Sequence, residues 1–349
     1  MRWLKDIQVG LVLLWGYARL PSRRPIPELH LAVRHYAQTS MRAIAELPLE
    51  SRGKWAYRLC WLLYVEGWRA TALEVAKTFG DALSAVDLAL FYWNGGDHQS
   101  AVDLLIQQNA DLSKLPAWAT MAVGWYFMSE CEVGFLSKMT LPETTRRVLE
   151  EISQVPPSFC PERVEAVLQE ARNAGPEIQE WVADLLLVWG ALNHLSPQQL
   201  GAGHRAVWHL LCGELQDAHR WAIRALRKDK ACMLSRLVLA VTLRARQPSK
   251  SRRVVERLLY PELTHGVVNT ESRIGRLIAK CLTGHQVTNE EMEESIKMCE
   301  FLHDAVLLVF VMYGAHVLGN NAAVSLACNT LKQWQACEFP ILQAWGLIC

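Results

Sequence analysis

Apolar residues recur along most of this chain at the three-to-four-residue spacing of one helix face, and strand-like alternation is essentially absent. In the C-terminal part, the helical runs are interrupted at Gly213, Gln247-Pro248, Gly284 and Gly319-Asn320. Measured from positions 213, 247, 284 and 319, the steps are 34, 37 and 35 residues. Even steps of this length are typical of stacked helical hairpins. The pattern therefore predicts an all-α protein, an α-solenoid of stacked antiparallel helical hairpins.

A first helical array is predicted for residues 28–130. Gly67 and the run Gly95-Gly96-Asp97 mark corners there, because glycine adopts the left-handed conformation that ends a helix and Asp97 can cap the next one. The predicted helices are 29–45, 55–66, 68–79, 82–93, 98–109 and 116–129.

Residues 131–176 contain five prolines and break the pattern. We expect an irregular connector here with short helices at 142–153 and 161–174, each beginning with proline in its first turn. Regular hairpins resume in a second array, 177–349, and the apolar segment 340–348 is expected to close the stack.

The N-terminal segment, 1–27, differs from the rest because residues 7–18 are nearly all apolar and arginines flank them. Twelve helical residues rise only about 18 Å, well short of the roughly 30 Å hydrocarbon core of a bilayer. No small-residue cleavage site follows, so a removable signal peptide is a poor fit. Three alternatives remain, which are a cap on the first repeat, a helix in the membrane interface, and a true span. The membrane-interface candidates are Trp3, Trp15, Tyr17, Arg19, Arg23 and Arg24.

Composition sets the class of protein and the compartment. Apolar residues make up 51% of the chain and charged residues 20%, which argues against disorder. The ten cysteines are scattered and form no C-x-x-C pair, so we expect free thiols in a reducing compartment. The predicted location is the cytoplasm, with peripheral attachment to the inner face of a membrane as the alternative.

Three corners carry a family resemblance. Small residues follow Gly96 at Ala101, Gly213 at Ala218, and Gly319 at Ala323. This pattern resembles tetratricopeptide repeats, in which glycine occupies the corner and alanine lies early and late in the second helix. The resemblance implies a TPR-like superhelix that binds peptides or partner proteins in its groove, and it transfers no catalytic residue. Proline at the end of the second helix is mostly absent, which fits a divergent member.

Basic residues concentrate between positions 220 and 257, where the sequence has twelve basic and two acidic residues. The local charge of +10 lies within a chain of net charge +1, so the remainder sums to −9. We call these basic residues the basic stripe. Its predicted partner-binding residues are Arg220, Arg224, Arg227, Lys228, Arg244, Arg246, Arg252 and Arg253.

The basic stripe could bind an acidic segment of a protein, a phosphate-rich ligand, nucleic acid or anionic lipid. The alternative is a solvated face that is balanced by an acidic patch at Glu290, Glu291, Glu293 and Glu294. Nucleic acid is disfavoured, because only Trp221 within this stretch and Tyr260 just beyond it supply aromatic rings.

Catalytic and metal-binding patterns are weak. His204 and His209 are five residues apart, His194 lies further off, and no acidic residue lies at a helical offset that would complete a metal site. Nucleophile-elbow, zinc-protease and phosphate-loop motifs are absent. The sequence thus predicts a non-catalytic scaffold or adaptor without cofactor or metal, which binds a protein partner carrying an acidic segment. The alternatives are a docking subunit of a membrane-linked biosynthetic or secretion enzyme complex, and a nucleic-acid-binding repeat protein.

Overall fold

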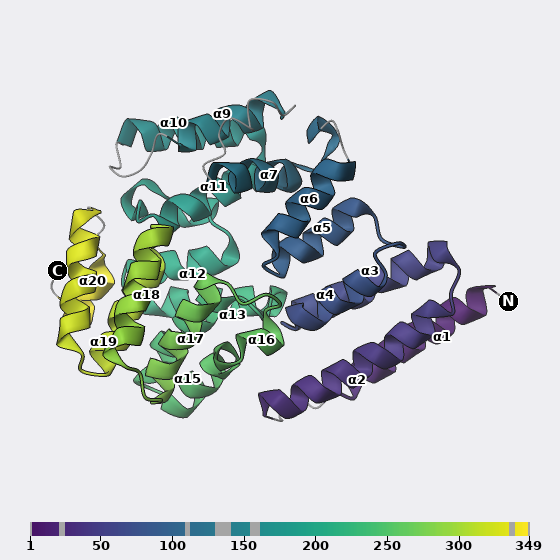
Figure 1. The fold of residues 1–349 in the computed structure, drawn as a ribbon. Coiled ribbons are helices and arrows are strands. Elements are labelled where there is room, and N and C mark those ends of the chain that lie inside the picture. Colours follow the sequence, from purple (N-terminus) through teal and green to yellow (C-terminus); the bar gives the residue numbers. More distant parts are fainter. Residues whose placement is uncertain are drawn as a thin grey trace. The chain divides into compact units, whose positions relative to one another are not determined.

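The computed structural model describes residues 2–20, 25–108, 112–129, 141–153, 161–334 and 339–347. These residues form α-helices and short 3-10 helices, with no strand among them, so the prediction of an all-α protein is confirmed (Figure 1). The α-helices are α1 (Arg2–Ala18), α2 (Ile26–Ala45), α3 (Leu49–Val65), α4 (Arg69–Thr78), α5 (Ala85–Asn94), α6 (His98–Gln108), α7 (Ala117–Ser129), α9 (Glu143–Ile152), α10 (Pro161–Ala174), α11 (Pro176–Val188), α12 (Ala202–Leu211), α13 (Leu215–Lys228), α14 (Met233–Arg244), α15 (Pro248–Val255), α16 (Pro261–Thr264), α17 (Thr270–Thr283), α18 (Asn289–Leu302), α19 (Ala305–Val317), α20 (Asn321–Gln333) and α21 (Pro340–Ala344). The 3-10 helices are η1 (Leu112–Lys114), η2 (Leu192–His194), η3 (Pro197–Gln199) and η4 (Glu256–Leu259).

Most helices pack against their neighbours in sequence, as in the pairs α5–α6, α12–α13, α14–α15 and α19–α20. The predicted corner glycines Gly67, Gly96, Gly213, Gly284 and Gly319 all adopt a positive φ. This backbone region is readily accessible to glycine and rare for other residues, so the corners lie where the sequence places them.

Two helices begin earlier than the predicted ranges 29–45 and 55–66. The helix α2 begins at Ile26 with Pro27 in its first turn, and α3 begins at Leu49, directly after Pro48. A proline in the first turn loses no hydrogen bond, because the first N–H groups of a helix have no partner within it. The short helices of the proline-rich stretch, α9 and α10, begin close to their predicted prolines, while residues 130–140 and 154–160 lie outside the described part.

The helices divide into two compact units. The first holds α1 to α6 together with two segments from much later in the chain, Asp229–Ala231 and Tyr260–Asn269, the second of which contains α16. The second unit holds α7 to α15, η4 and α17 to α21. The helix α7 therefore belongs with the C-terminal helices, although its sequence pattern continues that of α6.

Each unit has its own core. In the first unit, Trp68 and Leu59 are fully buried among apolar side chains of α2 to α4, and the α1 residues Val9 and Leu13 join them. In the second unit, every residue of α19 from Ala305 to Ala315 is buried. A helix that is apolar all round belongs at the centre of a core, and α19 contacts α11, α17, α18 and α20.

No helix in the described part of the chain is both long enough and apolar enough to cross a bilayer.

Candidate partner-binding surfaces

Seven of the eight predicted partner-binding residues of the basic stripe fall on two separate surfaces of the second unit. Arg220, Arg224, Arg227 and Lys228 lie exposed along α13, whose opposite face buries three alanines. Arg224 stacks its guanidinium 4.6 Å from the centre of the Trp221 ring. These four side chains form a solvated basic face on one helix.

Three other arginines of the stripe line a groove of about 870 Å³ within the second unit. Arg244 comes from the end of α14, and Arg252 and Arg253 come from α15. Arg246 is exposed just beyond α14 and does not line the groove. The described lining residues are Arg244, Pro248, Ser249, Ser251, Arg252, Arg253, Glu256, Cys281, Leu282, Gly284, Val317 and Leu318.

Two of the groove arginines are held against the C-terminal end of α17. Arg252 donates from Nη2 to the carbonyl oxygen of Thr283 at 2.9 Å, and Arg244 donates from Nη1 to that of Leu282 at 3.3 Å. The last carbonyls of a helix lack partners within it and carry partial negative charge, so they attract and orient cations. A guanidinium has five N–H donors, so each arginine retains donors for a ligand.

The rest of the groove combines apolar surface with little acidic charge. Leu318 is 41% exposed there, and Glu256 is the one acidic side chain among the described lining residues. Cys281 is buried, and burial raises the pKa of its thiol to about 12, so this cysteine is neutral at physiological pH. The groove can therefore accept an anion beside an apolar group, and its cysteine is not an activated nucleophile.

The expectation of free thiols holds for part of the described chain. Cys60, Cys212, Cys232, Cys281 and Cys299 are free, whereas Cys328 is disulfide-bonded, so the expectation is wrong for that residue.

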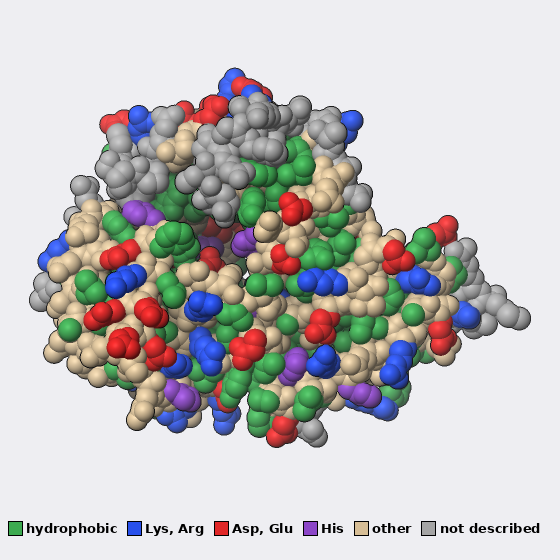
Figure 2. All heavy atoms as spheres, in the orientation of Figure 1, with side chains coloured by type: hydrophobic (Ala, Val, Ile, Leu, Met, Phe, Trp, Pro, Cys, Tyr) green, Lys and Arg blue, Asp and Glu red, His purple; other side chains and the backbone are tan. Residues whose placement is uncertain are grey.

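The acidic patch lies on α18 in the same unit. Figure 2 shows acidic side chains gathered over the region of α18, where Glu290, Glu293 and Glu294 are exposed. Glu291 caps the start of α18 and pairs with Lys280, whose hydrogen bond lowers the pKa of the Glu291 carboxyl. Among the residues that the structure describes, no ion pair joins this patch to the basic stripe. The stripe is therefore not neutralised by direct pairing with the patch.

Two other residues of the 220–257 stretch are used inside the first unit. Lys230 donates from Nζ to both carboxylate oxygens of Glu66, at 2.6 and 2.7 Å, and its backbone N–H donates to the carbonyl of Val65. Tyr17 donates its hydroxyl to the same Glu66 carboxylate at 2.6 Å, and this bond is the main reason that its pKa rises to about 12. These bonds tie α1, α3 and the segment Asp229–Ala231 together.

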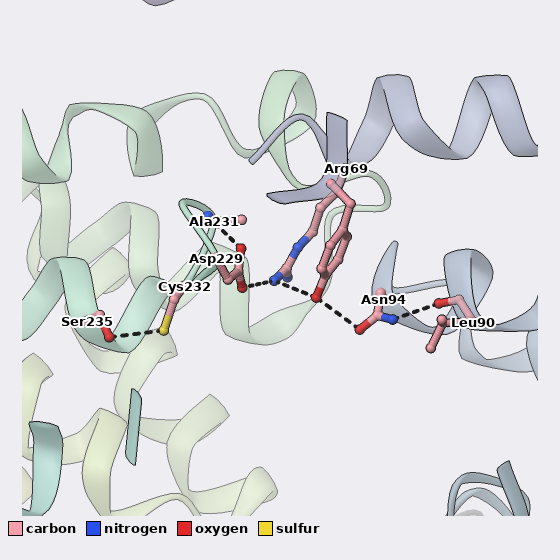
Figure 3. Close-up of polar contacts among 8 residues, drawn as sticks. Arg69, Leu90, Asn94, Asp229, Ala231, Cys232 and Ser235 are labelled. Atoms are coloured by element: carbon pink, nitrogen blue, oxygen red, sulfur yellow. Dashed lines mark hydrogen bonds and ion pairs between the residues drawn. The ribbon is translucent and has the colours of Figure 1, made fainter. Parts of the chain in front are cut away.

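A second contact of that segment is drawn in Figure 3. Arg69 of α4 donates to Asp229 at 2.6 Å and to the hydroxyl of Tyr64 at 3.3 Å. Tyr64 donates in turn to Asn94, which donates to the carbonyl of Leu90. Residues about 160 positions apart in sequence thus meet in one polar network, which sequence spacing does not reveal.

Elsewhere in the stripe, Arg236 is buried and donates to the carbonyl of Val254. The local charge of +10 therefore overstates the basic surface that is open to a ligand, because Lys230 and Arg236 serve the fold. The exposed surplus lies on α13 and at the groove.

Two histidines, His204 and His209, have acidic partners that the sequence pattern does not predict. His204 lies 2.9 Å from the Asp184 carboxylate. Burial lowers the pKa of His204, but Asp184, with Asp304 and Glu271, outweighs burial and raises it. His209 lies 2.6 Å from Glu214, and the potential ligand atoms of His209, Glu214 and Asp217 all lie within 4.8 Å of one another. A helical offset could not find Glu214, because the corner at Gly213 separates it from His209.

The cluster of His209, Glu214 and Asp217 is shallow. Glu214 is exposed and Asp217 pairs with Arg220. Exposed acidic groups of this kind are common without a metal, and the absence of a metal site stays a prediction.

The membrane-interface candidates are distributed unevenly on α1. Trp15 is 62% exposed and Arg19 places its guanidinium 5.3 Å from the centre of the Trp15 ring. Tyr17 is half-buried, with its hydroxyl bonded to Glu66. Arg23, Arg24 and the side chain of Trp3 lie outside the described part.

No known protein family, curated protein or solved structure matches this chain. The functional argument therefore depends on its own surfaces.

Proposed function

We propose that this chain is a non-catalytic adaptor that binds an acidic segment of a protein partner in the groove between α14, α15, α17 and α19. The observation that carries the proposal is the groove itself, where Arg244, Arg252 and Arg253 lie beside the apolar Leu282 and Leu318. Arginine recognises carboxylates through paired N–H donors, and fixed guanidiniums lose less freedom when they bind. An extended segment that alternates acidic and apolar residues would satisfy both kinds of surface.

We also propose that the scaffold is a divergent TPR-like solenoid. Its support is the burial of the alanines that carry the resemblance, since Ala101, Ala218 and Ala323 all lie inside helix contacts. Small residues at these positions let the two helices of a hairpin approach closely. Helical-repeat proteins present such surfaces for extended partners, which agrees with a binding role.

The groove can be tested with a fluorescein-labelled peptide that places glutamates on both sides of a leucine pair. A matched peptide with glutamine in place of glutamate reports the contribution of charge. Replacing Arg252→Glu and Arg253→Glu together should weaken binding of the acidic peptide about tenfold or more at low salt, because charged hydrogen bonds are lost and repulsion is added. Anisotropy titrations at two salt concentrations measure this effect.

The matched control is Arg220→Glu with Arg224→Glu, which makes the same charge change on α13. We expect this pair to weaken binding much less, since its residues do not line the groove. Arg252 also caps α17, so Arg253→Glu alone is a second variant that preserves the cap. Equal losses in both double variants, or unchanged binding in both groove variants, would contradict the groove as the binding site.

A further inference from the structure

The outward face of α1 carries an apolar stripe that is separate from the groove. Ile7, Leu11, Leu14 and Trp15 are between 49% and 68% exposed. Their spacing of four, seven and eight residues places them on one side of the helix. Isolated exposed apolar residues are ordinary, but a continuous stripe of large ones marks an interaction surface.

The fold prevents this stripe from turning inward. The opposite side of α1 buries Val9 and Leu13, and Tyr36 of α2 donates its hydroxyl to the Leu13 carbonyl at 3.0 Å. At Gly16 a Cβ would lie 2.5 Å from the Tyr36 ring, so α1 lies very close to α2 at this point. The two helices run alongside each other in Figure 1, and the apolar stripe of α1 stays fixed on the outside.

The exposed charged residues at the two ends of the stripe are basic. Lys5 and Arg19 are exposed near its two ends. The only acidic residue of α1, Asp6, accepts hydrogen bonds from Trp55 at 2.8 Å and Ser51 at 3.5 Å, so its charge is engaged by α3.

We infer that the apolar stripe of α1 lies in the interface of an anionic lipid membrane, with the helix parallel to the surface. Leucine and isoleucine would enter the acyl boundary, and Trp15 would lie at the headgroup level, where tryptophan is enriched. Arg19 and Lys5 would contact anionic headgroups. This surface is independent of the proposed groove.

The same charges oppose a second copy of the chain as the occupant. In an antiparallel pairing of two α1 helices, Lys5 of each copy would approach Arg19 of the other. A parallel pairing would bring each cation against its own equivalent. In neither arrangement does α1 itself supply an outward-facing acid to offset the repulsion, whereas an anionic membrane supplies negative charge.

The test uses the full chain and sedimentation with two kinds of vesicle, phosphatidylcholine alone and phosphatidylcholine with about 30 mol% phosphatidylserine. The wild-type chain should sediment with the anionic vesicles at low salt and much less with the neutral ones. Leu11→Gln with Leu14→Gln should reduce the bound fraction about tenfold, because apolar insertion is lost. Lys5→Glu with Arg19→Glu should abolish the preference for phosphatidylserine.

The matched control is Leu215→Gln with Leu326→Gln, two exposed leucines of the second unit, and it should bind vesicles as the wild type does. Circular dichroism melts check that each variant is folded. Wild-type chain that stays in the supernatant with anionic vesicles would falsify the inference. Unchanged vesicle binding by the Leu11 and Leu14 variant would also contradict it. A third contrary outcome is self-association of the wild-type chain in analytical ultracentrifugation that is lost in this variant.

Discussion

The carboxyl of Asp304 caps α19 from a buried position, and burial disfavours the ionised form that prevails above neutral pH. Its carboxylate caps α19 by accepting from the backbone N–H of Leu307 at 2.7 Å, yet the side chain is buried. Burial raises its pKa from 3.8 to about 7. A carboxyl with a higher pKa in the folded state holds its proton more tightly there, so folding is favoured at low pH and this contribution is lost as the pH rises from about 4 to about 7.

Asp304→Asn should remove this part of the pH dependence while keeping the cap, because the asparagine oxygen can accept the same hydrogen bond. The pKa difference corresponds to about 4 kcal/mol at most, so the variant should be the more stable protein near pH 8. Urea unfolding near pH 5 and near pH 8, followed by circular dichroism, measures the change. His204, whose pKa is also raised, adds a slope of the same sign, and this slope should be smaller in the variant because Asp304 contributes to raising that pKa.

The matched control is Asn320→Asp at the start of α20. The Asn320 side chain caps this helix by accepting a hydrogen bond from the backbone N–H of Ala323, and it is only half-buried. We expect little new pH dependence there, because solvent stabilises the charge. If Asp304→Asn keeps the full wild-type slope between pH 5 and 8, the titrating group lies elsewhere.

At the scale of elements, close approach of backbones constrains α3. Gly53 lies in α3, and a Cβ there would lie 2.1 Å from the carbonyl oxygen of Ala82, in the loop before α5. Alanine is the better helix former by about 1 kcal/mol, but a clash with a backbone atom cannot be relieved by rotating a side chain. Steric cost should therefore exceed the gain in helix propensity.

Gly53→Ala is expected to lower the free energy of unfolding by about 1–3 kcal/mol, the usual range for overpacking. Gly80→Ala is the control, because its Cβ would meet Leu88 at an ordinary 3.4 Å. Thermal melts followed by circular dichroism compare the stability of both variants with that of the wild type. A Gly53→Ala protein as stable as the control would mean that the loop at Ala82 yields without cost.

The helices were predictable where local chemistry defines their ends. Gly213 and Gly319 end helices because the left-handed backbone they adopt disfavours most other residues, and this preference is visible in sequence. The first turns of α3 were missed because Pro48 can either end one helix or precede the next. Only the packing of α2 against α3 decides between these two roles.

For the candidate surfaces, the residues could be predicted from the sequence, but their grouping in space could not. The sequence identified Arg244, Arg252 and Arg253 as basic but could not bring them together, because the groove depends on how α17 ends against α14 and α15. Charge counting also included Lys230, whose partner Glu66 is 164 positions away. Contacts at such separations follow from tertiary packing, which no local pattern encodes.

At the scale of the whole molecule, the first unit is completed by residues from the C-terminal half. The segment Asp229–Ala231 contributes the Lys230–Glu66 and Asp229–Arg69 pairs to helices α3 and α4. The stability of the first unit should therefore respond to a change near position 230, which lies far from it in sequence.

Lys230→Gln should make the first unit open more often while leaving the second unit unchanged. The substitution removes the ion pair with Glu66 but keeps the backbone bond to Val65. Because the Lys230 side chain is 41% exposed, solvent screens the pair, and a loss of about 1 kcal/mol is expected. Hydrogen exchange followed by mass spectrometry should then show amide exchange about fivefold faster in α1 and α3, with no change in α19.

Lys228→Gln removes the same charge two positions earlier, from an exposed site on α13, and should leave exchange in both units unaltered. Equal acceleration in the two variants would mean that the effect comes from net charge rather than from the pair that joins Lys230 to Glu66.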